Sequence, residues 1–376
     1  MKPGVFLILL ILLSSQLLSA VPDSISSRKY NRQAWFVRIY KGQKGVERHE
    51  IKWEFDQYMS KQDFQNAVDF LTDKLSGLDS LENDYRMHTT GYIHGLRGYA
   101  QYHLMHYEAA MSDMNRAIEL VPKWSFGYYL RGLIHYQLRD LKAAIDDYTQ
   151  AIDRKHKHKR KVDINYYLER GDAYWNNGEI ENAMADFTKC IKLNPGWAYP
   201  YLRRGSARRN LQDQQGAKAD FEKAIALDPH LIGGYQVLGM FYYGQKDNDA
   251  AIEVIMNGLH HNPDSPVLYE MAGSFYLEKG DNTQAITYFT KCLEMFSDDS
   301  KDMTRLQALI GISVTYYIKD DKETSRKYFD QANQVLLVLN NGTKGLEEFE
   351  KYCLGLMEKE TEILSRMVEE FNNPYL

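Results

Sequence analysis

The sequence predicts an all-α fold built from repeated helix pairs, and three recurring positions carry this prediction. Seven glycines recur through the chain at a period of 34 residues wherever nothing is inserted. An alanine follows six of these glycines by twelve residues, and another small residue follows seven positions later. A regular period of this length is typical of repeat proteins whose units stack side by side. The glycines are Gly98, Gly132, Gly171, Gly205, Gly239, Gly273 and Gly311.

Each repeat has the pattern of two helices joined by a turn. In the first repeat the small residues Ala110 and Ala117 flank the bulky Met114, and the later repeats keep this order. Small residues let two helix backbones approach closely, while the bulky residue fills the space beside them. Turn residues such as Asn177-Gly178-Glu179 separate the helices, and a proline closes four of the repeats. One repeat cannot bury its own apolar face, so we expect the stacked repeats to share a continuous core.

Composition excludes several classes of protein. A chain of 376 residues exceeds the roughly 250–300 residues of a single core, so it is either multi-domain or elongated. A net charge of -5 provides no global electrostatic reason to bind nucleic acid. Three cysteines are too few for a disulfide scaffold. We therefore exclude basic nucleic-acid-binding proteins, multi-span membrane proteins and cystine-knot proteins.

The first 20 residues predict a secretory signal peptide. Lys2 precedes an unbroken apolar run from Val5 to Leu13, and Ala20 supplies a small residue at the expected cleavage position. The run is shorter than the ~20 residues that span a bilayer, which argues against an uncleaved membrane anchor. We therefore expect an exported protein without a transmembrane span after cleavage. A periplasmic location is the first expectation, and secretion or the lumen of the endoplasmic reticulum is the alternative.

With Gly, Ala, aromatic, Ala and Pro at a 34-residue period, the chain resembles the tetratricopeptide repeat family. The segments Leu130-Arg131-Gly132 and Glu169-Arg170-Gly171 look like the common Arg-Gly variant of the first helix. The resemblance covers seven repeats in residues 91–340 and implies a right-handed superhelical solenoid of helix-turn-helix repeats. Two departures stand out. The third repeat follows a five-residue insertion around residues 155–161, and Ser325 replaces the expected alanine of the seventh repeat.

The segments that flank the seven repeats have different predicted roles. Residues 21–47 form a basic N-terminal segment, and residues 48–90 contain a degenerate repeat and a connecting helix. Residues 344–371 carry apolar residues at helical spacing and predict an amphipathic capping helix over the last repeat. A partner-binding helix is the alternative use of residues 344–371.

The sequence carries no recognisable catalytic or cofactor-binding motif. It has no phosphate-binding loop, zinc-binding His-Glu-x-x-His pair, Cys-x-x-Cys pair or nucleophile elbow. Cys190 and Cys292 occupy the small-residue position of the second helix, where cysteine acts as a compact apolar residue. We therefore predict a non-enzymatic protein with no cofactor and no metal. The alternative is an enzyme whose chemistry resides in the unmatched N-terminal segment.

The resemblance also implies a binding surface. In this family the first helix of each repeat lines a concave groove, chiefly at repeat positions 2, 5, 9, 12 and 13. Tyr and Trp combine a rigid apolar body with a polar edge, and Asn can pair with the main chain of an extended peptide. Some of these aromatic residues are instead expected to pack between neighbouring helices. The predicted groove residues are Tyr92, Tyr99, Tyr102, Phe126, Tyr129, Leu133, Tyr136, Asn165, Asp172, Trp175, Asn176, Tyr199, Arg209, Asn210, Gln236, Met240 and Tyr243.

The insertion before the third repeat carries a run of basic residues from Arg154 to Lys161. One interpretation is a solvated loop. The other is a contact for an anionic surface such as lipid head groups, acidic glycans or an acidic protein. The residues of this predicted basic loop are Lys155, Lys157, Lys159, Arg160 and Lys161.

These observations predict a scaffold or adaptor that binds an extended or helical segment of a protein partner in its concave groove. The alternative is an accessory subunit of an envelope or lumenal assembly that binds an anionic partner through the basic loop 154–161. Chaperone-binding relatives hold a carboxylate with Lys and Asn at positions 5 and 9, where the second repeat has Tyr129 and Leu133. We therefore do not expect capture of a chaperone's acidic C-terminus. No nucleic-acid partner is expected, and the oligomeric state is left open.

Overall fold

The computed structural model describes residues 46–77, 84–157, 162–297, 300 and 302–339, together with the single positions 363, 366, 367 and 371. The predicted signal peptide, nearly all of the basic N-terminal segment and most of the predicted capping helix lie outside these residues. All regular structure in the described residues is α-helical, which confirms the predicted fold class. None of the helices in this part of the chain is long and apolar enough to cross a membrane.

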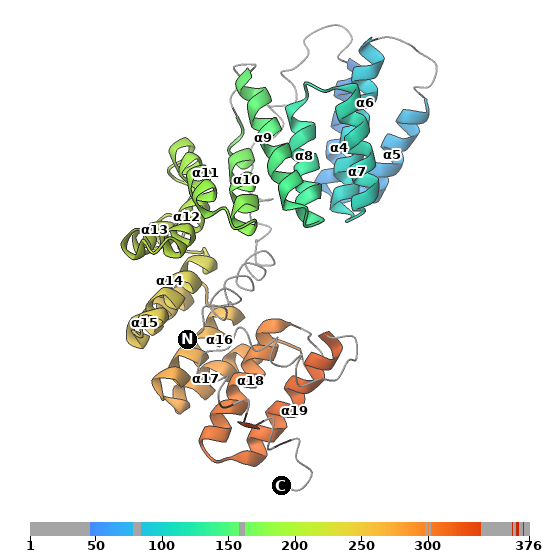
Figure 1. The fold of residues 1–376 in the computed structure, drawn as a ribbon. Coiled ribbons are helices and arrows are strands. Elements are labelled where there is room, and N and C mark those ends of the chain that lie inside the picture. The colour runs from blue at the N-terminus through green and yellow to red at the C-terminus, as the bar shows by residue number, and fades with distance from the viewer. Residues whose placement is uncertain are drawn as a thin grey trace. The chain divides into compact units, whose positions relative to one another are not determined.

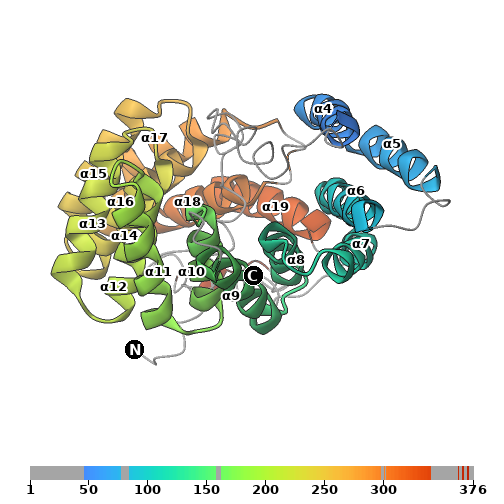
Figure 2. The same ribbon diagram turned by 90° about the horizontal axis from the view of Figure 1, so that it is seen from above.

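The described residues within 28–214 form one compact part. Its helices follow one another in pairs, and the two helices of the first repeat, α6 and α7, lie side by side in Figure 1 and again in Figure 2. Phe55, Ala67 and Leu71 of the predicted degenerate repeat are buried between α4, α5 and α6. The helices of this N-terminal part are α4 (Val46–Ser60), α5 (Phe64–Ser76), α6 (Asp84–His103), α7 (Tyr107–Leu120), α8 (Ser125–Gln137), α9 (Leu141–Lys157), α10 (Ile164–Asn176), α11 (Ile180–Leu193) and α12 (Ala198–Asn210).

The described residues within 215–376 belong to a second compact part. Its helix pairs α14 and α15, α16 and α17, and α18 and α19 each pack together. First helices of neighbouring repeats also contact one another, because α16 touches both α14 and α18. The helices of this C-terminal part are α13 (Gln214–Leu227), α14 (Ile232–Gly244), α15 (Asn248–His261), α16 (Pro266–Lys279), α17 (Asn282–Leu293), α18 (Met303–Ile318) and α19 (Lys322–Leu339).

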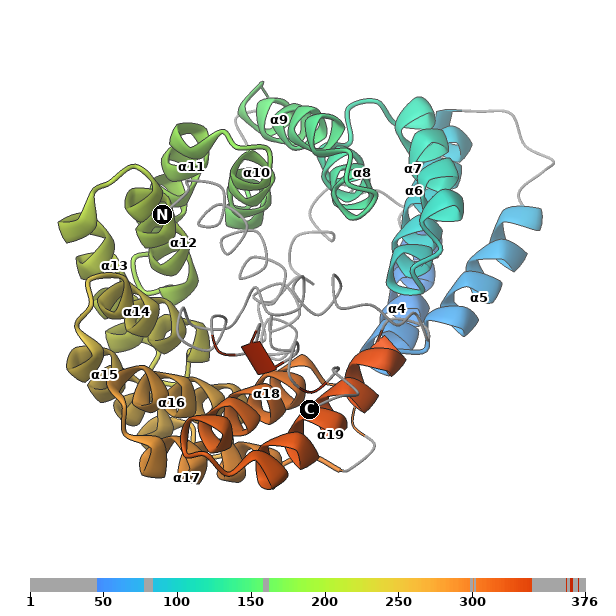
Figure 3. The same cartoon turned by 60° about the horizontal axis from the view of Figure 1, so that its bottom comes forward.

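The first and second helices of the repeats occupy different sides of the N-terminal part. Figure 3 shows α8 and α10 on the inner side of the curve that this part follows, and α9 and α11 on the outer side. The first helices form a continuous row, since α8 contacts both α6 and α10. We call the surface that α6, α8, α10 and α12 present at the predicted groove positions the inner face.

Gly132 and Gly171 lie where the first helix of a repeat packs closely against the second helix. A Cβ atom on Gly132 would lie 2.7 Å from a ring carbon of Tyr148, and one on Gly171 would lie 2.7 Å from Phe187. Both distances are far shorter than the roughly 3.5–4.0 Å of an optimal carbon contact. Ala144, on the second helix beside Tyr148, has no exposed surface. The predicted packing of small residues around one bulky residue is therefore confirmed.

The turn between the two helices of a repeat places one residue in the left-handed backbone region. Gly178 and Gly280 do so with φ of 82° and 90°. Other repeats place a side-chain-bearing residue there, such as Arg139 at φ 64° and Lys246 at φ 62°. The turns predicted at Asn177-Gly178-Glu179 and Lys279-Gly280-Asp281 thus lie where the chain reverses between helices.

The structure explains the departure at Ser325. Ser325 Oγ donates a hydrogen bond to the carbonyl of Ser313 in α18 at 2.9 Å, and Ser313 Oγ donates to the carbonyl of Ser325 at 2.6 Å. Both side chains are fully buried. Because each buried hydroxyl has a partner, the expected alanine can be replaced without leaving a polar group unpaired.

The described residues of the predicted capping helix pack against the seventh repeat. Met367 is fully buried in the core cluster that α18 and α19 form. The ring of Phe371 lies 5.4 Å from that of Phe329 in α19, and Arg326 donates a hydrogen bond to the carbonyl of Phe371 at 3.4 Å. These contacts cover apolar surface at the end of the last repeat.

Candidate functional site

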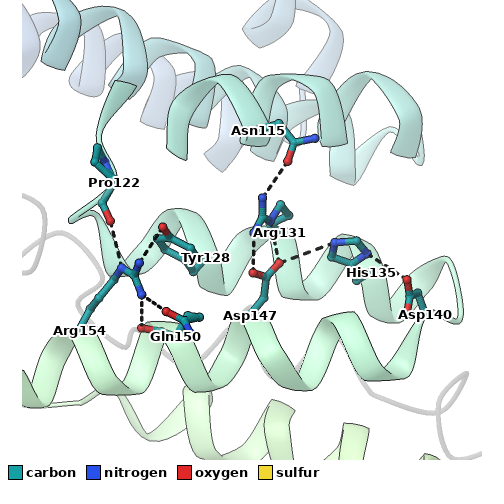
Figure 4. A network of polar contacts seen from close by, with 9 residues as sticks. All are labelled: Asn115, Pro122, Tyr128, Arg131, His135, Asp140, Asp147, Gln150 and Arg154. Carbon is teal, nitrogen blue, oxygen red and sulfur yellow. Dashed lines mark hydrogen bonds and ion pairs between the residues drawn. The ribbon is translucent and has the colours of Figure 1, made fainter. Parts of the chain in front are cut away.

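The helices that carry the inner face are held by a partly buried ion pair, which we call the Arg–Asp bridge. In the second repeat, Arg131 of α8 donates through Nε and Nη2 to the two carboxylate oxygens of Asp147 in α9, each at 2.8 Å (Figure 4). Arg131 Nη1 also donates to Asn115 Oδ1 in α7 of the first repeat, at 2.9 Å. One guanidinium group therefore joins three helices and couples the second repeat to the first.

The Arg–Asp bridge recurs in the neighbouring repeats with the same 16-residue spacing. The arginine that immediately precedes the recurring glycine pairs with the aspartate of the second helix and also reaches back to the preceding repeat. The first-repeat bridge comprises Arg97, Asp113 and Thr72, and the third-repeat bridge comprises Arg170, Asp186 and Thr149.

The environments of the bridge carboxylates differ. Burial raises the pKa of Asp113, but hydrogen bonds from Arg97 and His94 outweigh burial, and the pKa of Asp113 falls below its ordinary value. Burial raises the pKa of Asp186 above its ordinary value despite the hydrogen bonds from Arg170. His94 Nδ1 lies 2.7 Å from an Asp113 oxygen, so the first bridge has a second partner on its carboxylate.

The basic run begins inside α9 and is not a loop at its start. The guanidinium of Arg154 lies 3.8 Å from the ring centre of Tyr128 and donates to the Tyr128 hydroxyl at 2.8 Å and to the Pro122 carbonyl at 3.0 Å (Figure 4). Lys155 is only 2% exposed, so its predicted role as a surface contact is wrong. Lys157 is exposed at the end of α9. The remaining predicted residues, Lys159, Arg160 and Lys161, lie outside the described residues.

Most predicted groove residues of the N-terminal part are partly exposed on the first helices. Helical spacing places positions 2, 5, 9 and 12 of each first helix on one face. Tyr136 is the exception, because it is buried at 8% exposure and its hydroxyl accepts a hydrogen bond from the Asn176 amide. The prediction that Tyr136 is an exposed lining residue is therefore wrong. The partly exposed residues are Tyr92, Tyr99, Tyr102, Phe126, Tyr129, Leu133, Asn165, Asp172, Trp175, Asn176, Tyr199, Arg209 and Asn210.

The aromatic end of the inner face is also part of the core between repeats. The ring of Tyr129 stacks on Tyr166 of the third repeat, with centroids 4.5 Å apart, and on Phe126 at 5.8 Å. Tyr99 meets the ring of His103 edge-on at 4.6 Å. The expectation that some aromatic residues pack between neighbouring helices is therefore confirmed for Tyr129. Partner binding at this end would use rings that are already immobilised.

The polar end of the inner face lies across α10 and α12. Arg203 Nε of α12 donates to Asp172 Oδ1 of α10 at 2.6 Å, and its guanidinium lies 5.7 Å from the ring centre of Trp175. Burial raises the pKa of Asp172 although Arg203 opposes this shift. Burial alone lowers the pKa of Arg203, but Asp172 outweighs it, so Arg203 stays charged. The result is a desolvated ion pair beside an indole ring.

The phenol groups along the inner face are desolvated as well. Burial raises the pKa of Tyr102 to about 12. Burial likewise raises the pKa of Tyr136 and of Tyr199, in each case with the charge of Asp172 adding to the shift. These phenols therefore stay neutral at physiological pH and can donate a hydrogen bond.

In the C-terminal part, α14 carries the three remaining predicted groove residues, and all of them are partly exposed. Tyr243 stacks on Phe275 of α16 with ring centroids 5.8 Å apart. Met240 packs against the core cluster that surrounds Phe275, and Gln236 lies one turn before Met240 on α14. This surface is more apolar than the α10 and α12 surface, because it carries no charged residue at these positions.

Sequence reasoning missed Arg203 as a residue of the inner face. The doublet Arg203-Arg204 precedes Gly205, and only the second arginine matches the Arg-Gly variant. Arg203, the first of the two, occupies repeat position 6, next to the predicted lining positions 5 and 9. This place beside the lining positions was the signal in the sequence that could have identified Arg203. Its partner Asp172 is 31 residues away in sequence, so the pair is visible only in three dimensions.

The described residues contain no group of three or more His, Cys, Asp and Glu side chains that could hold a metal ion. Cys190 and Cys292 are both fully buried, as expected for the small-residue position. Burial raises the pKa of both thiols well above the ordinary value, so both stay protonated.

Comparison with known proteins identifies the repeats. The sequence profile of the tetratricopeptide repeat matches residues 127–158, 164–196, 198–231 and 267–299. No curated protein matches the chain in sequence. Among solved structures, a tetratricopeptide repeat protein from Parabacteroides merdae ATCC 43184 is 18% identical, with 71% of this chain and 99% of that chain covered and a TM-score of 0.52.

A second solved structure is similar to the same extent. It is the C-terminal part of a tetratricopeptide repeat-containing protein from Cytophaga hutchinsonii, 17% identical, with 70% of this chain and 99% of that chain covered and a TM-score of 0.50. Likeness at this level of identity concerns the fold, and it agrees with the matched repeats. The four matched segments are therefore tetratricopeptide repeats.

Proposed function

We propose that the chain is a non-enzymatic scaffold or adaptor in an exported compartment, and that it binds an extended or helical segment of a protein partner along its inner face. Tetratricopeptide repeats are protein-interaction modules, which supports the general role. The compartment rests on the signal-like leader of residues 1–20.

The observation that carries the proposal is a row of partly exposed aromatic and hydrogen-bonding side chains that is held in place by the protein itself. The Arg–Asp bridges fix the first helices, and Tyr129 is stacked before any partner arrives. Ordering an interface on binding costs roughly 0.5–1.5 kcal/mol for each flexible side chain immobilised. A surface that is already ordered avoids much of this cost.

The alternative use of the basic run has less support from the described residues. Arg154 is held against Tyr128, and Lys155 is buried, so neither supplies an accessible surface cation. Lys157 remains exposed and provides the test of this alternative.

The test is affinity capture from source-cell extract with the mature chain, residues 21–376, at low and high salt, followed by identification of the retained protein. We expect capture to survive high salt and to be lost in Trp175→Ala, which removes a partly exposed ring without a hydrogen-bond partner. Tyr129→Ala is less suitable, because Tyr129 also packs against Tyr166. Lys157→Glu is the matched surface control and should leave capture intact.

The opposite pattern would refute the proposal. If Trp175→Ala retained the partner while Lys157→Glu released it, and if salt alone released the wild-type complex, the binding surface would be the basic segment.

A further inference from the structure

A hydrogen-bonding pattern runs along the inner face from repeat to repeat. In two successive repeats, the amide at repeat position 13 donates to the tyrosine hydroxyl at position 12 of the preceding repeat. Gln137 Nε2 of α8 lies 3.4 Å from the Tyr102 hydroxyl of α6, and Asn176 Nδ2 of α10 donates to the Tyr136 hydroxyl of α8. These amide and hydroxyl groups therefore already have hydrogen-bond partners within the protein.

The pattern stops at α10 and α12. The next amide at position 13 is Asn210, and the residue at position 12 of the preceding repeat is Trp175. An indole ring has an N–H donor and no acceptor oxygen, so Asn210 has no hydroxyl to meet. Among the described residues, the Asn210 side chain and the Trp175 N–H make no hydrogen bond.

Arg209 adds a charge at the same place. Arg208 and Arg209 both lie in the last turn of α12, where cations complement the helix dipole. Arg208 also pairs with Asp213 at 3.5 Å, whereas Arg209 has no ion-pair partner among the described residues. Burial lowers the pKa of Arg209. A desolvated cation without a counter-ion is costly, and a bound anion would relieve that cost.

The inner faces of α10 and α12 meet beside Trp175. Arg203 of α12 contacts both Asp172 and the ring of Trp175 on α10, which places the inner faces of α10 and α12 next to each other. Arg209 lies six residues, or nearly two turns, after Arg203 on α12. The indole N–H, the Asn210 amide and the Arg209 guanidinium are all hydrogen-bond donors, and none of them has an acceptor among the described residues.

We propose that Trp175, Arg209 and Asn210 form a subsite for one acidic side chain, Asp or Glu, of the bound partner segment. The inference rests on the proposed function and specifies what the partner presents. A guanidinium binds a carboxylate with two parallel hydrogen bonds, and the amide and indole N–H groups can add a third. The fifth and ninth repeat positions of α12 are Leu202 and Ser206, so this subsite differs from the carboxylate clamp discussed above.

The experiment selects short random peptides against the full mature chain. The library is displayed at the N-terminus of a phage coat protein, so that no displayed peptide carries a free C-terminal carboxylate. We expect wild-type protein to enrich peptides that share Asp or Glu at one position. Arg209→Gln should lose this preference while still binding peptides, and Arg209→Glu should shift it to Lys or Arg.

Arg208→Gln is the matched control, because it removes the same charge from the neighbouring residue and should retain the acidic preference. Replacing the acid of a selected peptide by its amide should weaken binding to wild type by on the order of 10-fold or more. The same replacement should have no effect on binding to Arg209→Gln. Circular dichroism establishes that each variant keeps its helix content.

Four results would overturn the inference. Selected peptides without a shared acidic residue, or an acidic preference that persists in Arg209→Gln, would show that the subsite is not used while peptide binding itself stands. Selection only from a second library with free C-termini would assign the site to a terminal carboxylate. Failure of every variant and of wild type to select any peptide would overturn the proposed function as well.

Discussion

Replacing Asp147 by alanine tests the Arg–Asp bridge directly. The substitution removes both acceptor oxygens of Arg131 and leaves its guanidinium between α7, α8 and α9 with only the Asn115 hydrogen bond. The expected result is a local loss of stability in the second repeat and in its contact with the first.

The magnitude follows from the burial of the two partners. Removing one member of a buried ion pair costs about 3–5 kcal/mol, because the other charge stays buried and unpaired. The Asp147 side chain is 6% exposed and that of Arg131 is 24% exposed. Water reaches part of the guanidinium, so the lower end, about 3 kcal/mol, is expected. This corresponds to an increase on the order of 100-fold in the local opening equilibrium.

The assay is hydrogen exchange read by mass spectrometry on peptides from α8 and α9. Repeat arrays do not unfold as one two-state unit, so a local measurement is more informative than a single unfolding midpoint. Exchange in α8 and α9 should accelerate through local opening, whereas peptides from α16 and α17 serve as an internal reference.

The chain supplies its own control for this prediction. At the positions equivalent to Arg131 and Asp147, the fifth repeat has Leu238 and Val254. The double variant Arg131→Leu with Asp147→Val should recover most of the stability, since an apolar pair replaces a buried ion pair at little cost. A loss below about 1 kcal/mol for Asp147→Ala, or a double variant as unstable as the single one, would refute the reasoning.

Three further substitutions have defined outcomes. Gly280→Ala should lower the free energy of unfolding in urea by about 1 kcal/mol, because φ is 90° and no atom lies within 4 Å of the added Cβ, and no loss would contradict the strain argument. Gly273→Ala should cost about 1–3 kcal/mol, because its Cβ would lie 2.6 Å from the Phe289 ring, and adding Phe289→Leu should recover part of the thermal stability. Burial raises the pKa of Tyr102 to about 12 in the folded state, so the unfolded chain ionises first as pH rises from about 10, and stability falls through this range. Tyr102→Phe should flatten this alkaline loss in urea titrations, and an unchanged pH slope would contradict the assignment.

The helix pairs were predictable because they depend on residues at short, fixed spacing. Gly132 and Tyr148 belong to one repeat, and their contact follows from the pattern of small and bulky positions. The turn at Gly280 was predictable for the same local reason. Ser325 was recognisable as a departure, but only the structure shows that Ser313 satisfies it.

The candidate site was predictable in part. The resemblance to tetratricopeptide repeats implied that Tyr102, Trp175 and Arg209 line the groove, and the structure leaves each of them partly exposed. The same resemblance placed Tyr136 in the groove, but Asn176 and the neighbouring helices bury it. The insertion before the third repeat suggested that Lys155 lies in a loop, although α9 continues through this residue.

The sequence by itself determined the architecture of this protein, because nearest-neighbour packing in a repeat array requires only the residues that recur with the period. Tertiary structure alone decided which polar groups of the inner face are satisfied. Asp172 and Arg203 are 31 residues apart, and Tyr136 and Asn176 are 40 apart. Whether a side chain at a given position is exposed or covered depends on the residue that the next repeat brings against it, and that pairing is settled only when the helices pack.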